Sequence, residues 1–222
     1  MGQVIGDVFF FRQLMAFIWL LIMGHVAVAQ QVVTAPRILT AGDSLLIKEL
    51  YFSGIQQKSA GQLAAAEKTF DKLVLLQPDN DAAHFELARI YLEREDYTEA
   101  EQAAKRAVGI DPDNEWYWSI LLDIYKKTGN IKAMPSVFDG LIRVDPKKRS
   151  NYQEKAYVLY LDKQYQASLA TYDTISRRFG ETDEQYFTKS QIYLAQNDIK
   201  SAIGELETLV SRRPADDKGY IL

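Results

Sequence analysis

Side chains that could carry out catalysis are scarce in this sequence. It contains no cysteine and two histidines, of which only His84 lies outside the N-terminal apolar segment. Neither a Cys–His pair nor a cluster of histidine metal ligands can therefore be assembled. Carboxylates remain as candidates for acid–base chemistry, but pairs such as Glu93 and Glu95 lie at expected turns, where hydrated charge is the ordinary explanation. We expect a protein that is not an enzyme and that binds no cofactor or metal ion.

Basic residues do not form a surface suited to nucleic acid. The chain of 222 residues has a net charge of −4, and Lys147, Lys148 and Arg149 cluster at a single expected turn. A nucleic-acid site needs a continuous basic face. Arginine pairs at 177–178 and 212–213 lie near expected helix ends, where cations interact favourably with the helix dipole. We therefore expect no nucleic-acid partner.

The elements that position these side chains follow a repeat. In residues 81–114, apolar residues recur at helical spacing on both sides of Glu95 and Asp96, a pattern typical of two helices joined by a turn. Shifting this segment along the chain in steps of its own length brings prolines into one column, with Gly180 at the one exception. The prolines are Pro78, Pro112, Pro146 and Pro214. The chain is therefore expected to fold as a repeat array.

Two columns of the repeat contain mostly small side chains. One contains Gly54, Ala88, Ala156 and Ser190 and is interrupted by Leu122; the other contains Ala66, Ala100, Ser168 and Ala202 and is interrupted by Met134. Small residues at matching places on two antiparallel helices let the backbones approach closely, and larger residues in other columns fill the space beside them. His84 shares a column with aromatic residues, so we expect it to serve packing.

These columns resemble those of the tetratricopeptide repeat family, whose unit has the same length. The resemblance implies an all-α fold, a right-handed superhelical solenoid of antiparallel helix pairs. Lys155 and Lys189 depart from the family pattern because leucine is usual at their place. Pro135 is expected to make the second helix of the third copy start late or bend. The five copies cover residues 47–80, 81–114, 115–148, 149–182 and 183–216.

Residues 1–29 differ in character from the rest of the chain. Arg12 precedes a run without charge at 14–23, and residues 27–29 supply the small side chains that signal peptidase requires. The run is shorter than the roughly 20 apolar residues that span a bilayer. We expect a signal peptide cleaved after Ala29, with a retained anchor as the alternative. Because the chain lacks cysteine and Asn-x-Ser/Thr sequons, a bacterial periplasm is favoured over a eukaryotic secretory route.

The segments that flank the repeats are short. Residues 30–43 show no sustained period and are expected to form a leader or tether, and the repeats to occupy 44–216 after a helix cap at Asp43 or Ser44. Residues 217–222 are expected to open a truncated sixth repeat. Since a repeat array needs a terminal unit with a polar outer face, we expect a longer protein or a partner that completes this end.

Proteins with this repeat bind partners in a concave groove lined by the first helix of each copy. The resemblance assigns eight residues to that wall: Tyr51, Phe85, Arg89, Trp116, Lys126, Tyr157, Tyr160 and Phe187. Every copy contributes an aromatic residue, and a contiguous aromatic strip is typical of a protein-binding site. The wall also carries more basic than acidic residues, Lys58 among them, so a partner with some acidic residues is expected.

We predict a non-catalytic protein–protein interaction scaffold that binds a peptide or helix of a partner protein in this groove. One alternative is a structural component of a bacterial envelope assembly or secretion complex, which would associate with a membrane complex. Another is an accessory repeat domain of a larger protein that extends beyond Leu222.

Overall fold

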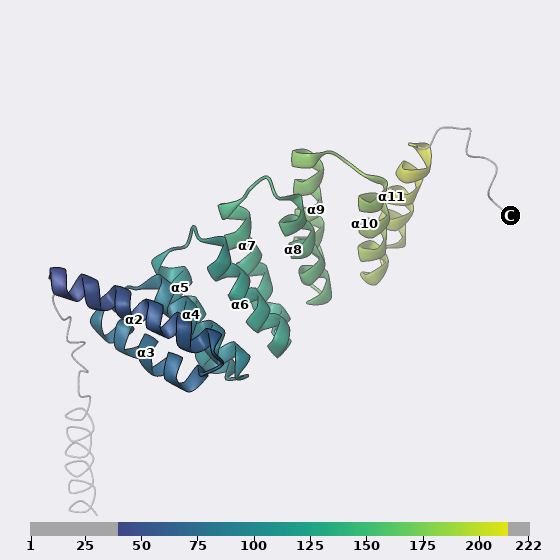
Figure 1. Ribbon diagram of the computed structural model, residues 1–222. Coiled ribbons are helices and arrows are strands. Elements are labelled where there is room, and N and C mark those ends of the chain that lie inside the picture. The colour runs from purple at the N-terminus through teal and green to yellow at the C-terminus, as the bar shows by residue number, and fades with distance from the viewer. Residues whose placement is uncertain (1–39, 213–222) are drawn as a thin grey trace, which may run out of the picture. The chain divides into compact units, whose positions relative to one another are not determined.

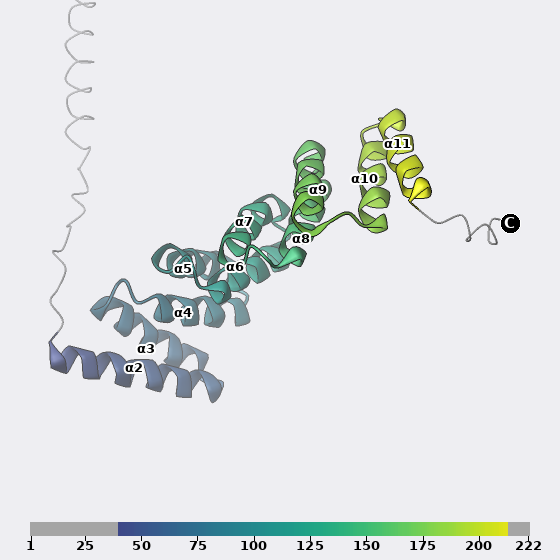
Figure 2. The ribbon, with the colours of Figure 1, turned by 90° about the horizontal axis from the view of Figure 1, so that it is seen from above.

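The computed structural model describes residues 40–212, and every regular element in this range is a helix. Consecutive helices pack as hairpins, and each hairpin packs on the next one along the chain (Figures 1 and 2). The pairs are α2 (Ala41–Ser59) with α3 (Leu63–Leu76), α4 (Asp81–Glu93) with α5 (Tyr97–Ile110), α6 (Glu115–Thr128) with α7 (Met134–Val144), α8 (Arg149–Leu161) with α9 (Tyr165–Phe179), and α10 (Asp183–Ala195) with α11 (Ile199–Ser211). The expected all-α array of helix pairs is thus confirmed.

Four expectations concern the ends of the chain. The expected signal peptide at 1–29 and the sixth repeat at 217–222 lie outside the described residues. Helix α2 begins at Ala41, so the expected cap residues Asp43 and Ser44 lie inside the helix, and the tether does not extend to residue 43. An acidic residue in the first turn, here Asp43, interacts favourably with the helix dipole. None of the described helices is both long enough and apolar enough to span a membrane.

The small-residue columns lie where the two helices of a hairpin meet. Ala88 of α4 and Ala100 of α5 are fully buried. In the first hairpin the close approach is between Gly54 and the Phe70 ring, because a Cβ added to Gly54 would lie 2.7 Å from that ring. A side chain at residue 54 and a phenyl ring at residue 70 therefore compete for the same space.

The third hairpin makes its close contact elsewhere. Leu122 and Met134, which interrupt the two small-residue columns, are both buried. The close approach instead joins Gly140 of α7 to Trp118 of α6, since a Cβ on Gly140 would overlap the indole ring. A single 3-10 turn at Ile131–Ala133 precedes α7, which therefore begins late, with Pro135 in its first turn. The late start predicted from Pro135 is confirmed.

The turns inside the five hairpins share one backbone conformation. The residue at the equivalent position of each turn has a positive φ: Gly61 (74°), Glu95 (63°), Gly129 (66°), Lys163 (60°) and Asn197 (61°). Two of them are glycine and one is asparagine, which adopt this left-handed region most readily. The other two show that the repeat geometry dictates the turn even where the residue type disfavours it.

The turns between hairpins are held by side chains from the repeat column that contains His84. In copies two to four the side chain of this column places a polar atom on the carbonyl oxygen of the proline that ends the preceding copy. The contacts join His84 Nε2 to Pro78 (3.0 Å), Trp118 Nε1 to Pro112 (2.8 Å) and Tyr152 OH to Pro146 (3.2 Å). His84 therefore has a structural role, as its column predicted.

An arginine covers the aromatic ring in the last three copies. Arg143 lies over Trp118, Arg178 over Tyr152 and Arg212 over Tyr186, at 5.7, 5.5 and 5.1 Å from the ring centroids. The first two arginines also donate to the proline carbonyls, each at 3.2 Å. From the sequence, the arginines at 178 and 212 were expected only to interact with the helix dipole, because they lie near helix ends. The structure shows a specific contact, in which the cation stacks on the ring.

In the fifth copy a carboxylate replaces the proline carbonyl. Gly180 occupies the place of the proline, with φ 83°, and the next residue is Glu181. The Glu181 carboxylate accepts hydrogen bonds from Tyr186 OH and from Arg212, both at 2.7 Å. A side-chain acceptor thus holds this turn.

The apolar core divides into two clusters, and α8 contributes to both. Leu87 and Leu121 are buried in the column where α8 has Lys155. The ammonium group needs an anionic partner at that place, and it finds one in Asp139 of α7 at 2.6 Å. The two clusters thus meet at α8, where a charged side chain stands in the column of the buried leucines.

Candidate protein-binding surface

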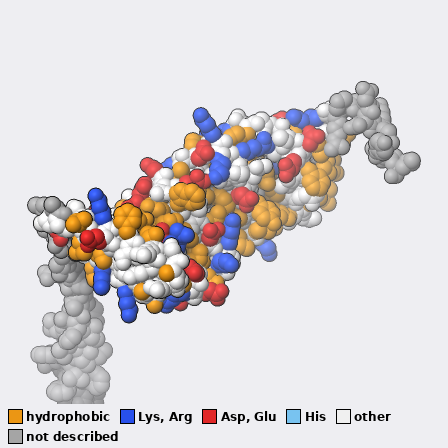
Figure 3. Space-filling view, viewed as in Figure 1, with side chains coloured by type: hydrophobic (Ala, Val, Ile, Leu, Met, Phe, Trp, Pro, Cys, Tyr) orange, Lys and Arg blue, Asp and Glu red, His pale blue; other side chains and the backbone are white. Residues whose placement is uncertain are grey.

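The eight residues of the expected wall, which we call the candidate wall, all lie on first helices of hairpins. Tyr51 is on α2, Phe85 and Arg89 are on α4, Trp116 and Lys126 are on α6, Tyr157 and Tyr160 are on α8, and Phe187 is on α10. Five of them are exposed: Arg89, Trp116, Lys126, Tyr157 and Phe187. The other three are half-buried. One face of the array shows hydrophobic side chains in patches between charged ones (Figure 3).

Three exposed rings dominate the candidate wall. Trp116 is 72% exposed, and Tyr157 and Phe187 are each 53% exposed. Asn114 caps α6 by accepting a hydrogen bond from the backbone N–H of Trp116 at 3.1 Å, which fixes the helix turn that carries the indole. The three rings stand on the first helices of three successive hairpins, α6, α8 and α10.

The rings on the first two copies are engaged in packing. Tyr51 meets Phe70 edge-on, with ring centroids 6.0 Å apart, and Phe85 packs on Tyr117 at 5.1 Å. The Tyr117 hydroxyl donates to Asp81 at 2.7 Å. Burial, together with this bond, raises the pKa of Tyr117 far above its ordinary value. Tyr51 and Phe85 therefore present only their outer edges to a partner.

Tyr160 occupies an intermediate position. It is half-buried, and its ring packs on Tyr165 of α9 at 5.9 Å with the ring planes tilted by 50°. This contact ties the ring to the second helix of its own hairpin. The neighbouring Tyr157 on the same helix is more exposed, so of this pair Tyr157 offers the larger free area.

A buried carboxylate lies behind the charged part of the candidate wall. Glu86 is 4% exposed and forms ion pairs with Lys58 and with Arg89, the second at 3.3 Å. Arg89 also lies over the Phe85 ring, 5.6 Å from its centroid. Burial, followed by the nearby charge of Glu86, raises the pKa of Tyr51.

These contacts correct the expected charge of the surface. The Lys58 side chain is only 13% exposed and is neutralised by Glu86, so it is not available as a free cation. Arg89 keeps about half of its side chain exposed, and Lys126 is exposed as well. The basic character of the candidate wall in this region therefore rests on Arg89 and Lys126.

The described residues offer no arrangement typical of a metal centre. Between residues 40 and 212, no group of three His, Cys, Asp or Glu side chains lies close enough to hold a metal ion. The imidazole of His84 contacts the Pro78 carbonyl, as described above.

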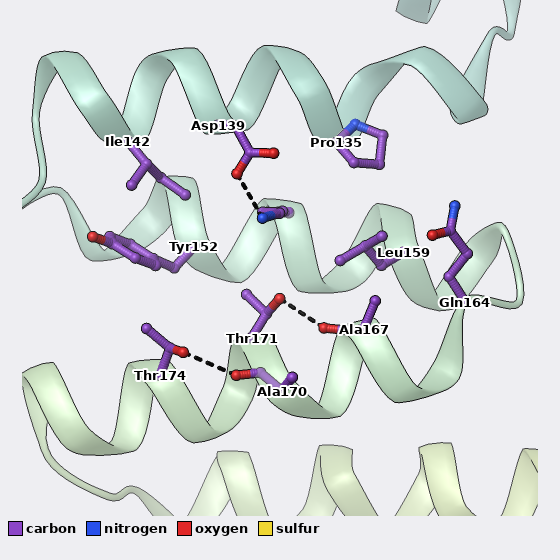
Figure 4. Close-up of a pocket in the computed structure, with 11 residues that line it drawn as sticks. Pro135, Asp139, Ile142, Tyr152, Leu159, Gln164, Ala167, Ala170, Thr171 and Thr174 are labelled. Atoms are coloured by element: carbon purple, nitrogen blue, oxygen red, sulfur yellow. Dashed lines mark hydrogen bonds and ion pairs between the residues drawn. The ribbon is translucent and has the colours of Figure 1, made fainter.

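The repeat pattern did not predict the cavities. One of about 510 Å³ lies between α7 and α9, over α8 (Figure 4). A second of about 490 Å³ is lined by residues of α4 and α5, including His84 and Tyr91. Burial and the acidic residues Asp71 and Glu67 raise the pKa of Tyr91 to about 12. Neither cavity is lined by a residue of the candidate wall.

Residues 57–115 match a family model described as the tetratricopeptide repeat. The matched segment runs from the end of α2 to the start of α6. No curated protein is significantly similar to the chain.

Solved structures share the fold over most of the chain. The crystal structure of MamA protein is 13% identical and has a TM-score of 0.53, covering 81% of this chain and 99% of that chain. YrrB, described as a TPR protein with an unusual peptide-binding site, is 14% identical with a TM-score of 0.52, covering 78% and 93%. Naa15/Naa10 bound to HypK-THB is 15% identical with a TM-score of 0.53, covering 77% and 27%. At these identities the likeness is one of fold.

Proposed function

Because the array has the tetratricopeptide repeat fold, we propose that this chain is a non-catalytic scaffold that binds a peptide or helix of a partner protein along the candidate wall. The observation that carries the proposal is the exposure of Trp116, Tyr157 and Phe187 on helices of successive hairpins. Rigid rings provide a large contact area at a low cost in side-chain entropy. The peptide-binding site of YrrB, a protein with the same fold, supports a peptide or protein as the partner.

The charges of the candidate wall define the chemistry of the partner. Arg89 and Lys126 are exposed and basic, whereas Lys58 is already neutralised. A segment with apolar anchors for the rings and one or two acidic residues for these cations fits the surface. Because exposed charges are screened by salt and apolar contacts are not, added salt weakens such binding only in part.

Replacing Trp116 or Tyr157 with alanine is expected to weaken binding by at least about 2 kcal/mol each, since central aromatic residues concentrate interface energy. The measurement is titration calorimetry with peptides selected by display on the full chain. Leu75→Ala is the matched control, because Leu75 is 82% exposed but lies on the second helix α3. Circular dichroism verifies that each variant is folded. Full binding by a folded Trp116→Ala/Tyr157→Ala double variant would place the partner elsewhere on the molecule.

We also propose that the chain is exported to a bacterial periplasm. The basis is the sequence of residues 1–29, with an apolar run followed by Ala27, Val28 and Ala29, and the lack of cysteine in the chain. Protein recovered from the periplasm is expected to have the mass of a chain that starts at Gln30, as measured by intact-mass spectrometry. A mass that includes residues 1–29 would instead identify a retained anchor.

A further inference from the structure

The cavity of about 510 Å³ is a trench between two second helices. Figure 4 shows its walls, which are α7 on one side and α9 on the other, with α8 as the floor. Five of its eleven lining residues are apolar or small: Pro135, Ile142, Leu159, Ala167 and Ala170. Lys155 lies at the floor, and its ammonium group is paired with Asp139 on α7 at 2.6 Å.

Lys189 occupies the place of Lys155 in the next copy of the repeat. There the ammonium group lies between two carboxylates, Asp173 at 3.1 Å and Glu205 at 2.8 Å. Burial disfavours the charge, but the bonds to Glu205 and Asp173 prevail and raise the pKa of Lys189. A lysine in this column thus accommodates a carboxylate from each side.

Lys155 has only the first of these two partners. Asp139 is the repeat equivalent of Asp173, whereas the equivalent of Glu205 is Thr171 on α9, one copy earlier. Thr171 lines the trench and donates its hydroxyl to the Ala167 carbonyl at 2.8 Å (Figure 4). Lys155 is 23% exposed, and Asp139 is its one carboxylate partner among residues 40–212. An ammonium group has three donors, so donors remain for an acceptor in the trench.

We propose that this trench binds an aspartate or glutamate side chain of a partner protein, whose carboxylate takes the place against Lys155 that Glu205 takes against Lys189. The small side chains of Ala167 and Ala170 leave room for the backbone that carries the acidic residue. The apolar lining of Pro135, Ile142 and Leu159 suits small apolar neighbours in the bound segment. Partial exclusion of water strengthens the ion pair relative to one on an open surface.

The trench is separate from the candidate wall. Successive helix residues are rotated by about 100°, so Lys155 and Leu159 lie on one side of α8, and Tyr157 lies on the other. A partner can therefore occupy the trench while the candidate wall is free. This inference does not depend on the proposed function of the wall.

The test uses ¹⁵N-labelled full chain and two peptides, acetyl-Ala-Glu-Ala-amide and its glutamine isostere. The glutamate peptide is expected to shift the amide resonances of Ala170 and Thr171 in a saturable way, and the glutamine peptide is not. Lys155→Met should weaken the binding at least about tenfold, the effect of losing one hydrogen bond to a charged group. Comparable shifts with both peptides, unchanged binding by Lys155→Met, or no shift at the highest soluble concentration would overturn the proposal.

A second variant guards against a folding defect in Lys155→Met. Thr171→Glu places a carboxylate of the chain itself where Glu205 stands in the next copy. The variant is therefore expected to have a higher melting temperature and to bind the glutamate peptide at least about tenfold more weakly. In the Lys155→Met background the same change should not raise the melting temperature. Thr98→Glu at an exposed site on α5 is the control for an added glutamate elsewhere in the chain, and it should leave peptide binding unchanged. Normal binding by Thr171→Glu would contradict the assigned position of the ligand carboxylate.

Discussion

Replacing Glu86 with glutamine is expected to lower the free energy of unfolding by about 3–5 kcal/mol, because the change leaves a buried cation without its counterion. The side chains of Glu86 and Lys58 are 5% and 13% exposed, so water does little to replace the lost partner. Arg89, the second cation on Glu86, is about half exposed and can be hydrated. Urea denaturation followed by circular dichroism measures the effect.

Two further variants separate a lost ion pair from a general disturbance. Lys105→Gln breaks an exposed pair within one helix and should cost only about 0.3–0.5 kcal/mol. The double variant Lys58→Met/Glu86→Leu removes both charges and should be close to wild type, because apolar residues of similar size often replace a buried pair without loss. If Glu86→Gln were as stable as wild type, the buried pair would not stabilise the junction between the first two hairpins.

Phe70→Ala is expected to lower the free energy of unfolding by a similar amount, about 3–5 kcal/mol, since the ring is fully buried and leaves a cavity. Gly54→Ala should also destabilise, by about 1–3 kcal/mol, because its new methyl group would lie 2.7 Å from the Phe70 ring. In the double variant the methyl group enters the space that the ring vacated. The loss in free energy of unfolding of the double variant should therefore be smaller than the sum of the losses of the two single variants by at least about 1 kcal/mol.

Gly204→Ala is the control for the intrinsic effect of alanine in a helix. Gly204 lies inside α11, and a Cβ there would meet no atom within 4 Å. This change should stabilise the chain by about 0.5–1 kcal/mol. Strict additivity of Gly54→Ala and Phe70→Ala in denaturant midpoints would show that the two positions do not share one space.

The spacing of the repeat was sufficient to predict the helix pairs. Packing of this kind depends on side-chain size and helical phase, and both are visible as columns, such as the one that contains Ala88. The turn at Glu95 was predictable from its place between two helical runs, although glutamate disfavours the left-handed conformation found there. The late start of α7 was predictable from the backbone preference of Pro135. The start of α2 was not, since a helix can extend by a turn beyond its first apolar residue without a change in periodicity.

The candidate site was only partly predictable. Column positions identified three of the four large exposed rings among the described residues, Trp116 for example, because exposure follows from helical phase. They did not show that Lys58 is neutralised by Glu86, since those residues are 28 positions apart and their pairing depends on how two hairpins pack. The trench at Lys155 was not predictable either. The repeat column showed lysine in place of leucine, but the cavity depends on side-chain sizes on three helices.

The aromatic contacts between hairpins have one further consequence. At three of the four described junctions the acceptor is a main-chain carbonyl, which does not change its charge with pH. At the fourth it is the Glu181 carboxylate, which is half exposed. The hydrogen bond from Tyr186, and then the charge of Arg212, lower the pKa of Glu181. The contact of the charged carboxylate with Tyr186 and Arg212 is therefore present near neutral pH and is lost as the pH falls through that lowered pKa. Acid thus weakens the aromatic contact between the fourth and fifth hairpins, whereas the acceptors of the other three aromatic contacts do not change their charge.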